Sequence, residues 1–316
     1  MNRRQFLCTA SATAMAVRKI FGADASRYKI GYTSNTRGLT GGWQGDPLVG
    51  FREAHEVGFR WVEAFATALD QYYPDNAALL KQRIDEIGVN FVAITGGSRG
   101  GDTHFEDPAR RQAVIENHLG VVRFSKKFGA DHQKTNLGSR RPGGTTAEDL
   151  KNIAATLEEL GKRSLVEEGI PFGVHAHLGS QLQDQSEIDY LMANTDPKHV
   201  RFVLDTGHIT MAGMDPVALA RKLGHRVVEF HLKDTKPEDR GGAKHVPEPG
   251  HDQMKDPYFF PLGNGGVDFL ALKAHLDSIQ WKGFLVVELD TSPWRPAKES
   301  ARITANYIRK EMRISL

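Results

Sequence analysis

Residues 201–208 read RFVLDTGH and residues 227–234 read VVEFHLKD, and these two segments decide the fold. Each begins as a short apolar run, which is typical of a strand buried on both faces of a parallel sheet. Each ends in carboxylate and imidazole side chains. Comparable short apolar runs recur along the chain. The predicted strands are Lys29–Ser34, Arg60–Phe65, Phe91–Thr95, His132–Leu137, Pro171–His177, Arg201–Asp205, Val227–Leu232 and Phe284–Glu288.

Longer amphipathic stretches lie between these strands. In Val114–Phe128 and Leu150–Val166, apolar residues recur at the spacing of one helical face. Thr145–Glu148 resembles a capping box, and Asp215-Pro216 places a proline in a first helical turn. Glycines that would end helices stand before six strands: Gly58, Gly88, Gly129, Gly169, Gly224 and Gly283.

Eight strands that each precede a helix predict an α/β protein with a single (β/α)8 TIM barrel over residues 26–316. An open doubly wound sheet is the alternative. It is disfavoured because no glycine-rich dinucleotide fingerprint follows an early strand. The polar segment Asp234–Pro261 then follows the seventh strand, on the face where barrel enzymes carry their active sites.

Composition excludes several classes of protein. The chain has 316 residues, a formal charge of +2 and one cysteine, Cys8, so a disulfide scaffold and a cysteine-ligated metal are excluded. The small charge argues against a nucleic-acid partner. The sequence also lacks the apolar run of about 18 residues that stable membrane insertion would need.

Residues 1–25 resemble a twin-arginine signal peptide. Arg3-Arg4 precede Gln5-Phe6-Leu7, an apolar stretch follows, and Ala23-Asp24-Ala25 has the small-x-small pattern of a cleavage site. This pattern predicts export to the periplasm. The alternative is an ordinary N-terminus on a cytoplasmic protein, and Arg18-Lys19 favour it because they interrupt the apolar stretch.

Polar side chains gather at the predicted strand ends. His175 and His177 end the fifth strand and, by alternation, face the barrel interior. The sixth, seventh and eighth strands end in Asp205, in His231 and in Glu288. A lone histidine there is usually structural, and an Asp before Thr-Gly often caps a helix. Their recurrence at successive strand ends instead predicts a site for one divalent metal, Mn, Co, Fe or Zn.

Two other residues are candidates for substrate contact. Glu63 lies near the end of the second strand, and Trp43 lies in the loop after the first. An aromatic ring at the barrel mouth suits the apolar face of a sugar. The alternative for Trp43 is packing beneath its own loop.

The segments Leu204–His208, His231–Asp234 and Val287-Glu288 resemble the signature of the xylose-isomerase-like barrels. That superfamily includes sugar isomerases, ketose 3-epimerases, inosose dehydratases and endonuclease IV. His175–Ser180 and Gly263–Phe269 are most similar to the inosose dehydratases. The resemblance covers about Tyr28 to Met312 and is most specific from Ile170 to Asp290.

The resemblance implies metal ligation by Asp205, His231 and Glu288. The remaining ligand of the family, a glutamate, falls at His175, which leaves His175, His177 or neither as the fourth ligand. His208 is similar to a histidine that contacts substrate in the epimerases. Lys233 holds a position from which an amine would stabilise an enolate oxygen.

The chemistry implied is proton abstraction beside a carbonyl, through a metal-stabilised enediolate. Catalysis is expected from Glu288, His177 and Lys233, and substrate contact from His208, Glu63 and Trp43. One glutamate with several histidines favours dehydration of a keto-sugar or keto-cyclitol. The alternatives are a sugar isomerase or 3-epimerase, and a non-catalytic sugar-binding barrel; hydrolysis of abasic DNA is disfavoured. A homo-oligomer is compatible with the family.

Overall fold

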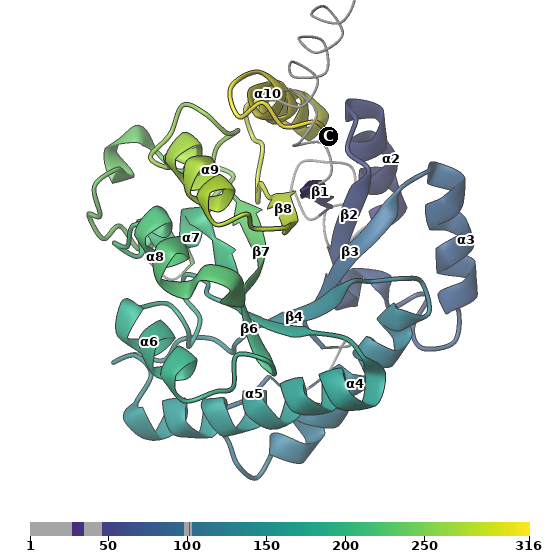
Figure 1. The fold of residues 1–316 in the computed structure, drawn as a ribbon, viewed down its shortest axis with the longest axis vertical. Helices are drawn as coiled ribbons and strands as arrows, with labels where there is room; N and C mark the ends of the chain where they lie inside the picture. The colour runs from purple at the N-terminus through teal and green to yellow at the C-terminus, as the bar shows by residue number, and fades with distance from the viewer. Residues whose placement is uncertain (1–26, 35–45, 98–100, 102, 249) are drawn as a thin grey trace, which may run out of the picture.

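The computed structural model describes residues 27–34, 46–97, 101, 103–248 and 250–316. Eight parallel strands close into one barrel in chain order, with β8 pairing with β1, as Figure 1 shows. The predicted (β/α)8 TIM barrel is therefore confirmed. Trp43 and the predicted leader 1–25 lie outside the described residues. The strands are β1 (Tyr28–Thr33), β2 (Trp61–Phe65), β3 (Asn90–Thr95), β4 (His132–Asn136), β5 (Phe172–His175), β6 (Val200–Asp205), β7 (Val227–Leu232) and β8 (Gly283–Val287).

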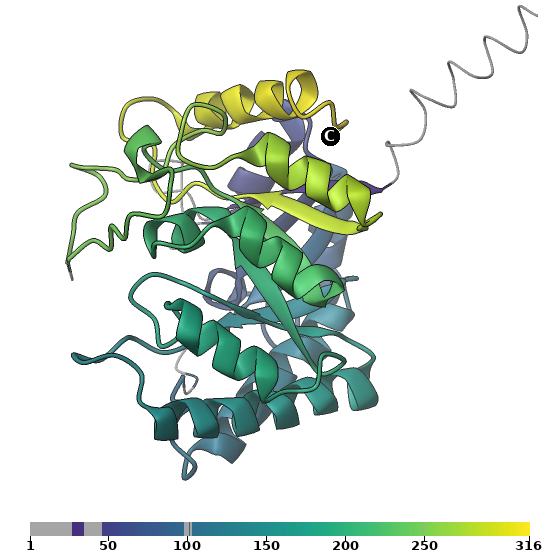
Figure 2. The same cartoon turned by 60° about the vertical axis from the view of Figure 1, so that its left-hand side comes forward.

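Helices surround the strands on the outside of the barrel (Figure 1). None of those in the described residues is both long and apolar enough to cross a membrane. In the side view of Figure 2, the connection after β7, drawn in green, extends from one end of the barrel. The α-helices are α2 (Pro47–Val57), α3 (Ala77–Ile87), α4 (Arg111–Lys126), α5 (Ala147–Glu168), α6 (Gln185–Ala193), α7 (Thr206–Met211), α8 (Pro216–Leu223), α9 (Phe269–Ser278) and α10 (Ala297–Lys310).

Most of the predicted helix boundaries are correct. The capping box of α5 begins at Thr146 and closes on Asp149, one residue later than predicted, and Asp215 caps α8 ahead of its proline. Two of the six glycines predicted to end helices are not caps. The C-cap of α4 is Lys127, two residues before Gly129, and Gly283 is the first residue of β8, where it pairs with Tyr28. Gln280, at φ 53°, is the residue in the left-handed region after α9.

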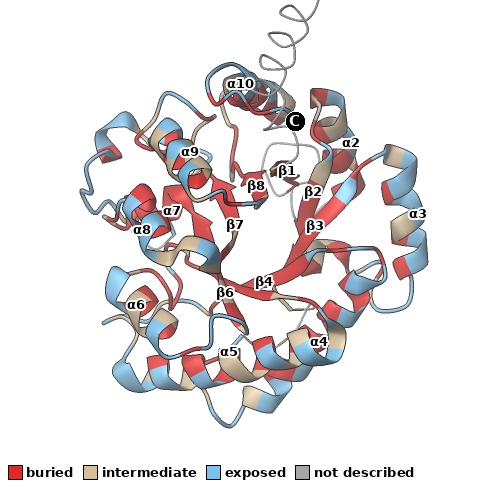
Figure 3. Ribbon diagram, viewed as in Figure 1, coloured by how far each residue is buried: buried red, intermediate tan, exposed pale blue. Residues whose placement is uncertain are grey.

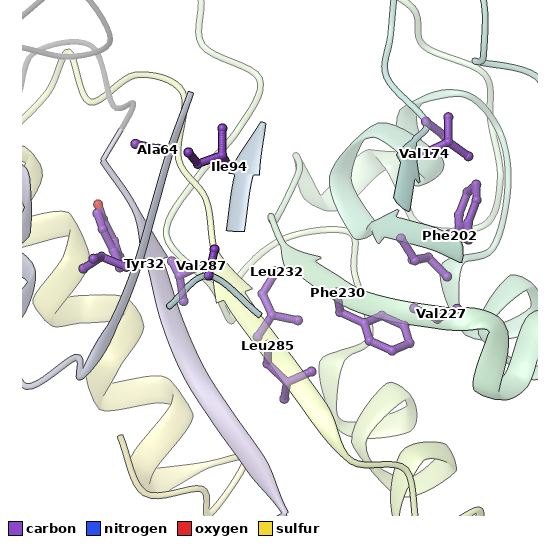
Figure 4. Close-up of a cluster of buried hydrophobic side chains, with 14 of the residues drawn as sticks. Tyr32, Ala64, Ile94, Val174, Phe202, Val227, Phe230, Leu232, Leu285 and Val287 are labelled. Carbon is purple, nitrogen blue, oxygen red and sulfur yellow. The ribbon is translucent and has the colours of Figure 1, made fainter. Parts of the chain in front are cut away.

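The outward faces of the strands form the main hydrophobic core with the helices. Figure 3 shows the barrel strands almost wholly buried, and Figure 4 shows part of this core. Val174, Phe202, Phe230 and Leu285 are at most 1% exposed. Burial of each such side chain stabilises the fold by about 1.5–3 kcal/mol. The alternating positions on the same strands face the barrel interior, so the core leaves them free for other side chains.

The barrel interior is only partly apolar. A small cluster of Val92, Ala93, Phe284 and Val286 packs with Trp61 toward the N-terminal ends of the strands. Farther along, the inward positions carry Lys134 and other ionisable side chains, all buried. Such barrels are usually filled by layers of branched apolar residues. The polar interior of this one leads directly to the strand ends.

The long connection after β7 is anchored at a single carboxylate. Asp234 accepts hydrogen bonds from the backbone N–H groups of Thr235, Gly263, Gly265 and Val267, at 2.8–3.1 Å. A Cβ at Gly265 would lie only 2.2 Å from the Asp234 Oδ1, so this approach requires glycine. Phe260 also donates its N–H to the Asp234 carbonyl. The two ends of the connection are therefore held together at the rim of the barrel.

Candidate metal and substrate site

Four buried side chains meet at the C-terminal ends of consecutive strands. His175, Asp205 and His231 lie in β5, β6 and β7, and Glu288 directly follows β8. Each offers a ligand atom, and these atoms lie within 4.8 Å of one another. His177 lies outside this group. Of the two histidines left open by the sequence, His175 is therefore the one placed to complete a four-ligand set.

The two oxygens of Asp205 have separate tasks. Oδ1 accepts the N–H groups of Gly207 and His208, at 2.8 and 2.9 Å, and so caps α7. Oδ2 faces His175 Nε2 at 3.6 Å and His231 Nδ1 at 3.5 Å. A Cβ at Gly207 would lie 2.8 Å from the Lys233 Cγ, so glycine is required where α7 meets β7. The helix cap and the candidate ligand are thus one residue.

The two nitrogens of His231 face opposite clusters. Nδ1 lies 2.5 Å from the Glu288 Oε2, and Nε2 lies 2.7 Å from the Glu229 Oε1. Nδ1 is therefore the nitrogen that faces the other candidate ligands, while Nε2 faces the buried cluster that contains Glu229 and Lys134. Sequence reasoning missed Glu229, although alternation two residues before His231 places it inside the barrel.

Charge and protonation in this group suit a divalent cation. Burial raises the pKa of Asp205 and of Glu288, but the Lys233 ammonium and the neighbouring histidines together outweigh burial and hold both well below their usual values. With Asp290, three carboxylates face one ammonium, which leaves two negative charges before the imidazoles are counted. Neighbouring carboxylates, Glu288 first, raise the pKa of His231 despite its burial, so a divalent cation at this site would displace a proton from that imidazole. Burial lowers the pKa of His175 to about 4, so its imidazole is neutral.

Several candidate ligand atoms lack hydrogen-bond partners, which also supports a metal site. Among the described residues, Asp205 Oδ2 and both ring nitrogens of His175 are buried and have no hydrogen-bond partner. Buried polar atoms are rarely left in this state. Two imidazoles with two carboxylates suit Mn, Co, Fe or Zn. His175, Asp205, His231 and Glu288 therefore fit the predicted metal.

A cavity of about 360 Å³ opens onto these ligands. It is of the size that a small ligand occupies. Its lining combines one aromatic ring with hydroxyl, amide, imidazole and carboxylate groups, which suit a polyhydroxylated ligand. The lining residues are Phe65, Thr67, Thr95, Asn136, His175, His177, His231, Gln253, Glu288 and Asp290.

His177 is presented to the cavity in one tautomer. Its Nδ1 lies 2.7 Å from the Leu178 carbonyl, which can only accept, so Nδ1 carries the hydrogen and Nε2 keeps a lone pair. Burial, reinforced by the Lys233 charge, lowers the pKa of His177. The imidazole is therefore neutral near pH 7 and is suited to accept a proton first.

Three other predicted site residues lie behind the cavity wall. His208 is buried with its ring 3.8 Å from that of His177. Glu63 is 2% exposed and pairs with Lys134, at 2.6 Å, below the metal ligands. Lys233, 1% exposed, is surrounded by carboxylates rather than directed at the cavity. None of these three is among the lining residues.

Asp290 is a cavity residue that sequence reasoning missed. Its Oδ1 accepts a hydrogen bond from the Lys233 Nζ at 2.9 Å, and its side chain is 20% exposed. It stands two residues after Glu288, just past the strand. If the in–out alternation of the strand is extended two residues past Glu288, it places Asp290 on the same side as Glu288.

Residues 51–311 match the family model described as the xylose isomerase-like TIM barrel, and the chain belongs to this family. It is 29% identical over 239 residues to the rhizopine catabolism protein MocC of Rhizobium meliloti, covering 72% of this chain and 71% of that protein. It is 27% identical over 228 residues to the inosose dehydratase of Geobacillus thermodenitrificans, covering 70% and 76%. The predicted family resemblance is confirmed.

A solved structure supports the fold. The IolI protein, crystallised with a bound zinc atom, superposes with a TM-score of 0.66 over 89% of this chain and 96% of its own. The sequence identity is 15%, so this likeness concerns the fold.

Proposed function

We propose that the protein is a divalent-metal-dependent lyase that dehydrates a keto-cyclitol or keto-sugar. The observation that carries this proposal is the convergence of His175, Asp205, His231 and Glu288 at the base of a polar cavity. The inosose dehydratase relative and the zinc bound by the IolI protein support it.

A bound divalent ion would supply Lewis-acid polarisation of the substrate carbonyl. The protein supplies the rest of the electrostatic setting. Lys233 places a fixed positive charge beside Asp205 and Glu288, at 3.3 and 3.2 Å. Because Lys233 is buried, it acts on the substrate through these carboxylates and through the Asp290 that it holds. Asp290, in the cavity, accepts hydrogen bonds from substrate hydroxyl groups.

His177 is the proton-carrying group, and Glu288 stands beside it as a candidate metal ligand. His177 Nε2 takes the proton from the carbon beside the carbonyl. The imidazolium then returns it to the hydroxyl on the next carbon, the C–O bond breaks, and water leaves with no net change in the protein. In the epimerases of this family, two glutamates share the proton transfers. Glu288 alone occupies such a position here, and this asymmetry favours elimination over epimerisation.

Epimerisation or isomerisation is the second candidate. The cavity wall carries Asp290 as a second carboxylate near Glu288. A proton returned to carbon by His177 or by a carboxylate would give an epimer or an isomer instead of an alkene. A non-catalytic sugar-binding barrel is the remaining alternative.

Metal analysis and a substrate screen test the proposal together. Purified protein is assayed for bound Mn, Co, Fe and Zn, then incubated in deuterated water with 2-keto-cyclitols and 3-keto-sugars and followed by NMR. We expect metal-dependent loss of water, abolished by chelation and by Glu288→Gln. Deuterium at carbon without dehydration would favour the epimerase. Full activity after chelation would overturn metal dependence, and sugar binding without turnover would identify a binding protein.

We further propose export of the folded enzyme by the twin-arginine route, from Arg3-Arg4 and the sequence that follows them. When the full chain is expressed in a host with this pathway, the protein is expected in the periplasmic fraction. Replacement of both arginines by lysine should retain it in the cytoplasm. Equal distribution of the two proteins would contradict export.

A further inference from the structure

A second, fully buried ionic cluster lies directly beneath the four metal ligands. It consists of Glu63 from β2, Lys134 from β4 and Glu229 from β7, and it shares His231 with the ligand set above. None of the four side chains is more than 4% exposed. No part of the proposed reaction uses Glu63, Lys134 or Glu229 directly.

Glu63, Glu229 and His231 have the arrangement of a metal site. Each offers a ligand atom, and the three atoms lie within 4.8 Å of one another. His231 Nε2 is 3.1 Å from Glu63 Oε1 and 2.7 Å from Glu229 Oε1. Two carboxylates and an imidazole suit the same divalent ions as the upper site.

The Lys134 amine occupies the centre of this arrangement. Its Nζ lies 2.6 Å from the Glu63 Oε2 and also contacts Glu229 Oε1 and His231 Nε2. The amine forms ion pairs with two buried carboxylates, so it supplies a positive charge between them. It contacts the side chains that a second metal ion would use.

We infer that Lys134 is a resident cation that fills a second metal position and so holds the protein to one divalent ion per chain. An ammonium on a fixed stem provides positive charge at this depth without exchange with solvent. It also leaves His231 available to a single ion, through Nδ1. The inference depends on the proposed function in one respect: the single divalent ion is the one proposed to bind at His175, Asp205, His231 and Glu288.

The stoichiometry of bound Mn²⁺ tests this inference. The wild type, Lys134→Ala and Lys134→Ala/Glu229→Gln are equilibrated with excess Mn²⁺, gel-filtered and analysed for manganese per chain. We expect one ion in the wild type, two in Lys134→Ala, and one in the double variant, which lacks a ligand of the lower position. Two ions in the wild type, or no increase in a folded Lys134→Ala protein, would overturn the inference.

Stability provides a second readout, because Lys134→Ala removes the ammonium from two buried carboxylates, of which Glu229 keeps its contact with His132 at 2.7 Å. Its thermal midpoint should fall in chelator and recover with Mn²⁺, and the double variant should show a smaller recovery. A variant that stays unfolded both with and without Mn²⁺ would contradict the inference, since a divalent ion should replace the ammonium. In the manganese analysis, a wild type without bound ion and a Lys134→Ala variant with one ion would overturn the upper metal site and leave the inference about Lys134 standing.

Discussion

The Nζ of Lys233 donates a hydrogen bond to the Oδ1 of Asp290 at 2.9 Å, so a buried ammonium holds a carboxylate at the cavity wall. Asp290→Asn keeps the shape of this side chain but removes its charge. Loss of a charged hydrogen bond to a substrate hydroxyl is worth about 1.5–3 kcal/mol, or roughly 10- to 100-fold in kcat/KM. Steady-state kinetics with metal analysis checks this prediction. Unchanged kcat/KM would show that Asp290 does not contact substrate.

His175 and His177 should differ in a direct comparison. His175→Ala removes a ligand, so its affinity for Mn²⁺ should fall by more than about tenfold. His177→Ala should bind Mn²⁺ as the wild type does but lose roughly 10²- to 10⁴-fold in kcat, the contribution typical of a general acid or base. Calorimetric titration with Mn²⁺ and turnover measurements on both variants check this. Equal metal affinities would remove His175 from the ligand set.

Glu229 should set metal affinity without touching the metal. Glu229→Gln weakens the acceptor that orients His231, and loss of such a partner typically costs 10- to 100-fold in affinity. Glu187→Gln is the matched control, since Glu187 is also buried but pairs with Arg140, at 2.8 Å. The control should lose stability and keep its metal affinity. A similar loss of affinity in both variants would indicate a general effect of unfolding.

His118 should make the fold sensitive to acid. Burial lowers its pKa from 6.5 to about 4 in the folded protein, where its Nδ1 donates to the Val114 carbonyl. As the pH falls, the imidazole binds a proton near pH 6.5 in the unfolded chain but only near pH 4 in the folded protein. Between these values, proton binding therefore favours the unfolded chain. The free energy of unfolding should therefore drop by about 3 kcal/mol between these values.

Urea unfolding at neutral pH and near pH 4 measures this loss. The His118 ring packs against Phe105 and Phe172, so a phenylalanine suits this position. His118→Phe removes the titrating group, and its free energy of unfolding should decrease less between the two pH values. His225→Phe is the control, because His225 is exposed, and it should behave as the wild type. The same pH dependence in wild type and His118→Phe would contradict the prediction.

The barrel and its upper ligands were predictable because both depend on local patterns. Apolar runs define the strands, and Asp205 and His231 stand where those runs end. Lys134 and Glu229 were not assigned a role, because their interaction arises only when strands 95 residues apart in sequence close into one barrel. Lys233 was placed correctly at the end of the seventh strand, but one of its contacts is Asp290, which lies beyond the predicted eighth strand.

The four backbone hydrogen bonds to Asp234 make residues 235–262 an excursion that starts and finishes at one fixed point. Gln253, which lines the cavity, lies on this excursion, whereas His231 and Glu288 stand at the strand ends outside it. One wall of the cavity is therefore supplied by a segment that is separate in sequence from the strand ends that carry the candidate ligands.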